Sequence, residues 1–197
     1  SVGVQVLSSK STALRMVAAQ ELTEAELGGS AVDNYLLATL KNSTDTVELQ
    51  QAIKMIPKLT SKKYIIEQLV KDLIAGRISP EIQLEVLETA TTISRDSPGL
   101  KMQLEHYNNY INKQDIMTRY GVALKGGNAE KGNSIFFGHA QAQCSRCHAL
   151  KQIDKQVGPS LEGIAKRHSR EYLLQSIVDP QAKITQGYGI VTGQLTD

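Results

Sequence analysis

Apolar residues in the first 118 positions recur with the spacing of α-helices, and this periodicity constrains the fold more than any other feature. Within several segments they lie three or four positions apart, so each segment would bury one face as a helix. Asp45, with Glu48 three residues later, resembles the capping box that begins a helix. The clearest apolar runs lie at 47–56, 65–74, 82–93 and 100–111. The sequence therefore predicts an all-α fold of short helices joined by tight turns.

These helices also return at a nearly constant distance along the chain. Ile53 and Leu87 hold corresponding places in two successive helices, and three further pairs are separated by one position less. A helix pair that recurs at intervals of about 33 to 34 residues predicts an α-solenoid of short, HEAT-like repeats. A plain helical bundle is the alternative, because two or three degenerate repeats are a small sample. The three further pairs are Leu36 and Leu69, Leu37 and Val70, and Leu40 and Leu73.

The character of the chain changes near Arg119. Five glycines arrive between Gly121 and Gly138, after a long stretch with few glycines. A glycine-rich chain suits close wrapping around a flat prosthetic group. We therefore predict a helical-repeat domain at 1–118, a linker at 119–127 and a smaller domain at 128–197, whose last residues alternate as in a strand.

Both cysteines of the chain belong to one motif, Cys144-Ser145-Arg146-Cys147-His148. The C-x-x-C-H pattern attaches c-type haem. Each thiol can add to one vinyl group on the same edge of the porphyrin, and the adjacent imidazole then becomes the proximal iron ligand. We predict one covalent haem c bound through Cys144, Cys147 and His148.

Other interpretations of this motif find less support. A thioredoxin-like C-x-x-C needs a βαβ context, which the helical pattern does not offer. A zinc site needs two more ligands at suitable spacing, and there is no second cysteine pair. A disulfide between residues three positions apart would close a tiny loop and remove little chain entropy.

The residues around the motif resemble a class I cytochrome c. The segment 127–132, leading into Ile135-Phe136-Phe137, is similar to the opening helix of that family, and Val157-Gly158-Pro159-Ser160-Leu161 is similar to its Gly-Pro-x-Leu. The resemblance implies one-electron transfer. It also implies that the Pro159 carbonyl accepts the proton on Nδ1 of His148, which would orient the ring.

Helical repeats in front of this domain resemble a narrower group, the planctomycete-type HEAT-repeat cytochromes. The segment Ser169–Pro180, followed by Ile184 and Gly187-Tyr188, carries this resemblance. Members of that group are commonly fused behind propeller-type dehydrogenases. The resemblance therefore implies a dehydrogenase as the redox partner.

The second axial ligand of the iron is not evident. Class I cytochromes usually supply a methionine downstream of the haem motif. His168 lies 20 residues after His148 and is a candidate distal ligand; the alternative is an exposed residue in a basic stretch. The family also continues beyond the length seen here, so we expect that the chain is truncated. All four methionines precede the haem motif: Met16, Met55, Met102 and Met117.

Composition limits the remaining function classes. A formal net charge of +2 predicts no nucleic-acid partner, and no apolar run approaches the roughly 18 residues of a membrane span. Covalent haem suggests a periplasmic or otherwise extracytoplasmic protein. An open-site haem protein with gas-binding or peroxidase activity, and a helical-repeat interaction module, are the alternatives to an electron carrier. Repeat arrays with an unsealed end can stack, so a homodimer is also compatible with the sequence.

Overall fold

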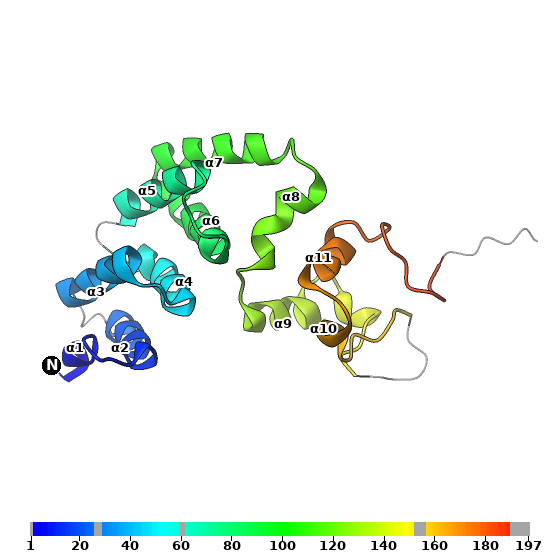
Figure 1. Ribbon diagram of the computed structural model, residues 1–197, viewed down its shortest axis with the longest axis horizontal. Helices are drawn as coiled ribbons and strands as arrows, with labels where there is room; N and C mark the ends of the chain where they lie inside the picture. The colour runs from blue at the N-terminus through cyan, green and yellow to red at the C-terminus, as the bar shows by residue number, and fades with distance from the viewer. Residues whose placement is uncertain (1, 26–28, 60–61, 152–156, 190–197) are drawn as a thin grey trace, which may run out of the picture. The chain divides into compact units, whose positions relative to one another are not determined.

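The computed structural model describes residues 2–25, 29–59, 62–151 and 157–189. Within these ranges the regular structure consists of α-helices and 3-10 helices without a strand, which confirms the all-α prediction (Figure 1). The strand predicted for the C-terminal residues lies outside the described residues. The chain divides into two compact units, Ser1–Gln114 and Asp115–Asp197, here called unit 1 and unit 2.

Unit 1 is built from consecutive helices that pack in pairs. Helix α3 packs on α4 and α5 packs on α6, while α4 also contacts both α2 and α6. The four predicted apolar runs correspond to α4, α5, α6 and α7. The elements are α1 (Val2–Val6), α2 (Thr12–Glu24), α3 (Gly29–Asn42), α4 (Thr46–Met55), η1 (Ile56–Lys58), α5 (Lys62–Ile74), η2 (Pro80–Ile82), α6 (Gln83–Ile93), η3 (Ser94–Asp96) and α7 (Pro98–Ile111).

Buried side chains of unit 1 recur at a constant number of positions along the sequence. This number, counted from Val32 to Ile66, is called the repeat offset below. The predicted offset between α3 and α5 is too short by one position, because Leu37 is 42% exposed whereas Val70 is fully buried. Leu36 and Leu37 of α3 are equally apolar, so the sequence does not show which of them corresponds to Val70. Leu36 is buried like Val70 and is therefore its counterpart. The buried sets at the repeat offset are Val32, Ile66 and Leu100; Leu36, Val70 and Leu104; Ala52 and Val86; and Leu22, Ile56 and Ala90.

The start of α4 departs from the predicted capping box. Asp45 caps the helix as expected, since its Oδ1 accepts hydrogen bonds from the backbone N–H groups of Val47 (2.9 Å) and Glu48 (3.0 Å). The reciprocal bond from the Asp45 N–H goes to the hydroxyl of Ser43 instead of the carboxylate of Glu48. Glu48 therefore has a different role.

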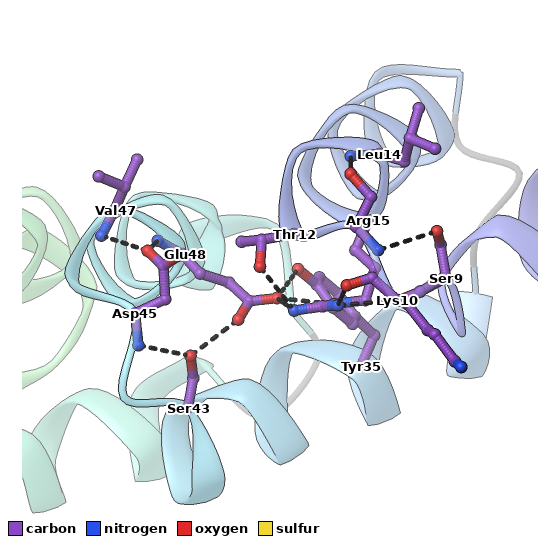
Figure 2. A network of polar contacts seen from close by, with 11 residues as sticks. Ser9, Lys10, Thr12, Leu14, Arg15, Tyr35, Ser43, Asp45, Val47 and Glu48 are labelled. Atoms are coloured by element: carbon purple, nitrogen blue, oxygen red, sulfur yellow. Dashed lines mark hydrogen bonds and ion pairs between the residues drawn. The ribbon is translucent and has the colours of Figure 1, made fainter.

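The Glu48 carboxylate joins three helices in a buried polar network (Figure 2). Its Oε1 accepts hydrogen bonds from Arg15 Nε (2.9 Å), Arg15 Nη2 (2.7 Å) and the Tyr35 hydroxyl (2.9 Å), and its Oε2 accepts one from the Ser43 hydroxyl (2.7 Å). The side chain of Glu48 is only 4% exposed. Burial alone would raise the pKa of this carboxyl. The hydrogen bonds from Ser43, Arg15 and Tyr35 and the charge of Arg15 outweigh burial and lower it.

We predict that Glu48→Gln destabilises the protein by about 2 kcal/mol at pH 7, because the partly buried Arg15 loses its counter-ion. The pKa of Glu48 is lowered by folding, so its ionisation stabilises the protein above the ordinary value of 4.5 and this contribution is lost as pH falls through the folded pKa. Urea unfolding followed by circular dichroism should therefore show a difference between wild type and variant that shrinks below about pH 4.5.

The exposed ion pair between Arg77 and Asp72 provides a control. Asp72→Asn should cost less than about 1 kcal/mol, as is usual for surface pairs. Equal losses for Asp72→Asn and Glu48→Gln would contradict the role assigned to the buried network.

Unit 2 contains shorter helices. They are α8 (Ile116–Tyr120), η4 (Gly121–Leu124), α9 (Ala129–Gly138), η5 (Cys144–Arg146), α10 (Ile164–Arg167) and α11 (Arg170–Val178). Helix α11 packs on α8 and η4, and Arg170 Nη1 donates a hydrogen bond to the Leu124 carbonyl at 2.8 Å. Residues 119–124 of the predicted linker are therefore helical and packed against α11. The domain limits drawn from the sequence stay predictions.

Candidate haem site

The C-x-x-C-H motif forms a single helical turn after α9. A left-handed residue, Gln143 (φ 46°), reverses the chain and η5 begins at Cys144. The Cys144 carbonyl then accepts hydrogen bonds from the N–H groups of Cys147 (3.3 Å) and His148 (3.0 Å). Residues three and four positions apart in such a turn share one face. The backbone therefore brings both thiols and the imidazole to the same side of the chain.

Residues 158–161 pack against this turn through two backbone hydrogen bonds. The Gly158 N–H donates to the Cys147 carbonyl at 2.9 Å, and the Leu161 N–H donates to the Ala149 carbonyl at 2.8 Å. These bonds flank His148 on both sides in the sequence. They fix the segment that follows Gly158 beside the imidazole.

The Pro159 carbonyl oxygen lies 2.9 Å from Nδ1 of His148, the contact that the resemblance to class I cytochromes implies. A carbonyl can only accept a hydrogen bond, so Nδ1 carries the proton in this arrangement. In the neutral imidazole, Nε2 then keeps its lone pair. The geometry thus leaves Nε2 able to bind a metal and fixes the orientation of the ring.

Gly158 makes this close approach possible. A Cβ atom at that position would lie 2.9 Å from Cε1 and 3.0 Å from Nδ1 of His148, and 3.0 Å from the Cys147 carbonyl oxygen. Two of these neighbours belong to the imidazole and the third is backbone, so none can move without disturbing the turn. In the sequence, Gly158 stands out only through the Gly-Pro-x-Leu similarity. Its importance follows from the distances to residues ten or more positions earlier.

The other histidines near the motif have different surroundings. His139 ends α9, and its Nδ1 accepts hydrogen bonds from the N–H groups of Ala142 (3.1 Å) and Gln141 (3.3 Å). His168 follows α10, is exposed, and stacks on Tyr172 with ring centroids 3.9 Å apart and an interplanar angle of 11°. The role of His168 as distal ligand stays a prediction.

The apolar side chains of unit 2 fit a large apolar group. Among its described residues only Gly158 is buried, whereas the buried hydrophobic side chains all belong to unit 1. Phe137 is 57% exposed and Leu150, two residues after the motif histidine, is 48% exposed. A porphyrin is a flat apolar group that such side chains can cover, and its burial would supply the missing hydrophobic stabilisation. Two thiols and an imidazole with a free Nε2 complete the donor set for a covalent haem.

No cluster of three or more His, Cys, Asp and Glu side chains is arranged to hold a metal ion in the part of the chain that the structure describes. The described helices also include none that is long and apolar enough to cross a membrane.

Comparison with known proteins adds independent support. The chain is 40% identical over 60 residues to a cytochrome c-553-like protein of Synechocystis sp. (strain ATCC 27184 / PCC 6803 / Kazusa). This similarity supports a cytochrome c domain. The match covers 30% of the chain, which spans about half the length (51%) of that relative. No protein-family model and no solved structure matches the chain.

We predict that Gly158→Ala destabilises the protein by about 1 to 3 kcal/mol, because the added methyl group meets the imidazole and a backbone carbonyl. Losing the bond to Pro159 should also make His148 a weaker electron donor and raise the reduction potential of the bound haem. Denaturant unfolding and potentiometric titration measure the two effects.

Gly132→Ala is the matched control. A Cβ at Gly132 in α9 meets no atom within 4 Å, so this variant should be neutral or more stable by up to about 1 kcal/mol. A Gly158→Ala protein that matches Gly132→Ala in stability and potential would show that the contact with His148 is unimportant.

Proposed function

We propose that the chain is a c-type cytochrome that carries one covalent haem in unit 2 and transfers single electrons. The observation that carries this proposal is the C-x-x-C-H turn whose histidine bonds through Nδ1 to the Pro159 carbonyl. The thiols of Cys144 and Cys147 would form the thioether links, and Nε2 of His148 would be the proximal ligand. When bound, the haem iron supplies a one-electron couple. The similarity to a cytochrome c-553-like protein supports this assignment.

His168 is our candidate for the second axial position. Stacking on Tyr172 holds the plane of its ring, and the nitrogen lone pair that would bind the iron lies in that plane. An imidazole in this position would make the iron low-spin and exclude external ligands. A vacant sixth position would instead favour the alternative function, gas binding or peroxidase activity.

Unit 1 would serve as a HEAT-like solenoid that presents the haem domain to its partner. The constant repeat offset between buried positions of successive helix pairs supports repeated units that stack on their neighbours. We propose a dehydrogenase as the partner and a periplasmic or other extracytoplasmic location, where a covalent link prevents loss of the cofactor. Stacking of two arrays through an open end would give a homodimer. A pure interaction module is the remaining alternative.

The haem content tests the core of the proposal. When the full chain is produced in a bacterial host with a cytochrome c maturation system, intact mass spectrometry should show the polypeptide plus one haem, retained after denaturation. Changing Cys144 and Cys147 together to Ser should abolish the attachment, since no thioether can form. Ser145→Ala in the same turn should keep it. Full-length protein that is matured beside a working control cytochrome and still carries no haem would refute the proposed function.

Absorption spectra with and without carbon monoxide test the axial ligand. We expect low-spin spectra unaffected by carbon monoxide in the wild type and prompt carbon monoxide binding in His168→Ala. His106→Ala, which changes an exposed histidine of α7, should behave as the wild type. Prompt carbon monoxide binding by the wild type would remove His168 as ligand and favour the open-site alternative.

A further inference from the structure

Helix α2 lies at the N-terminal end of unit 1 and is the counterpart of α4 in the preceding repeat (Figure 1). Its first residue, Thr12, stands one repeat offset before Thr46, the first residue of α4. Helix α4 packs on α2, and α6 packs on α4 in the same way. Within the described residues, α2 follows no helix of this kind, because α1 is its own pair partner and corresponds to the end of α3.

Helix α4 turns a defined face toward α2. Glu48 of this face bonds to Arg15 of α2, and Gln51 Nε2 donates a hydrogen bond to Gln20 Oε1 of α2 at 3.2 Å. Helix α6 turns the same face toward α4, where Lys54 Nζ lies 3.7 Å from Glu85 Oε1. Each helix of this series is therefore covered on one face by the helix before it.

The equivalent face of α2 is open. Leu14 is 55% exposed and Val17 is 58% exposed, although their counterparts in α4 and α6 are buried or half-buried. The internal repeats thus show that a helix normally covers these positions. The counterparts of Leu14 are Glu48 and Ile82, and those of Val17 are Gln51 and Glu85.

This open face is apolar at its centre and carries opposite charges at its ends. Lys10, directly before the N-cap Ser11, lies seven positions before Val17, and Glu24 lies seven positions after it. Seven residues make about two helical turns, so Lys10, Val17 and Glu24 lie nearly on one line along α2. Leu14 shares this face, and all four side chains are exposed. These four residues are here called the α2 stripe.

We propose that the α2 stripe is the surface through which two copies of this chain associate, with their α2 helices antiparallel about a two-fold axis at Val17. A two-fold interface needs a patch that is complementary to itself. In the antiparallel orientation, Val17 meets Val17 of the second copy, and Lys10 of each copy lies opposite Glu24 of the other. A parallel orientation would place like charges together.

The apolar centre and the charged ends have different parts in this interface. Burial of Leu14 and Val17 from both copies supplies the driving force. The two ion pairs lie at the rim, where they add little affinity but select the orientation. This inference rests on the homodimer proposed above and names its surface. It does not depend on the haem.

The test is sedimentation velocity of the haem-loaded full chain over a series of concentrations, with circular dichroism as the check on folding. The wild type should form a dimer whose share rises with concentration. Val17→Glu should raise the dissociation constant of the dimer at least about tenfold, because it places two carboxylates opposite each other at the centre of the interface. The exposed Val17 side chain leaves the fold of the single copy unaffected by this change.

Val47→Glu is the matched control. Val47 is 60% exposed on α4 and lies outside the α2 stripe, so this variant makes the same substitution at nearly the same exposure. Its dissociation constant should stay within about twofold of the wild-type value. Equal effects of Val17→Glu and Val47→Glu would show that only net charge matters and would overturn the proposed surface.

Charge reversal tests the orientation of the two helices. Lys10→Glu and Glu24→Lys should each raise the dissociation constant about three- to tenfold at low ionic strength, and the double variant should restore the wild-type value. Each reversal places the new charge where the α2 macrodipole favours it, so neither weakens the helix itself. A double variant that remains as weak as the single ones would overturn the antiparallel arrangement.

Other occupants of this face would give different results. A wild type that stays monomeric at every concentration would overturn the proposal and would leave the face to a helix pair of another protein. Species larger than a dimer would indicate stacking on the other end of unit 1 and would also overturn it. Failure of the proposed cytochrome function is recognised separately, because it would show as a missing haem spectrum. A failed interface would leave a haem-loaded monomer.

Discussion

The hydrogen bond between the His148 imidazole and the Pro159 carbonyl sets the geometry around the C-x-x-C-H turn. It requires the proton on Nδ1, and therefore decides which nitrogen can face a metal. It also requires that residues 158–161 approach the ring more closely than any side chain at position 158 would permit. The two backbone bonds that flank it hold the two segments together. The imidazole is thus oriented by the protein, and a porphyrin attached at the neighbouring thiols would meet a ligand that already has its direction.

Unit 1 depends on a different kind of constraint. Shifted by the repeat offset, the polar network of Arg15, Tyr35 and Glu48 coincides with Leu49, Leu69 and Ile82, which pack in or against the hydrophobic core. Helices α2, α3 and α4 thus carry polar side chains at positions where α4, α5 and η2 carry apolar ones. Repeated helices with similar apolar faces could pair with a helix displaced by one repeat at little cost in free energy. A pairing that separates Arg15 from Glu48 would leave the Glu48 carboxylate without its counter-ion, which is unfavourable. The network therefore distinguishes the correct order of the helices from a shifted one.

The sequence patterns predicted those structural features that depend on residues close together in the chain. Helical periodicity located α4 to α7, and Asp45 was correctly expected to begin α4, because both signals are local. The offset between α3 and α5 was wrong by one, since Leu36 and Leu37 are equally apolar and only burial separates them. Glu48 was expected to complete a local capping box. Its actual partners include Arg15, which lies in another helix far earlier in the chain, and no pattern in the sequence shows that contact. The need for a glycine at position 158 has the same kind of origin, because it arises where two segments ten residues apart in the chain approach each other.

The exposed apolar side chains of unit 2 have a consequence for how a haem domain with this sequence would be assembled. The described residues of this unit bury almost nothing, so a bound porphyrin would contribute much of its hydrophobic stabilisation. A reversibly bound ligand stabilises a fold by an amount that depends on its free concentration. A ligand joined by covalent bonds escapes that dependence, and dilution cannot remove it. Attachment at Cys144 and Cys147 would then make the stability gained from the cofactor independent of its free concentration. Before attachment, both thiols would be accessible to the enzymes that form the thioether bonds.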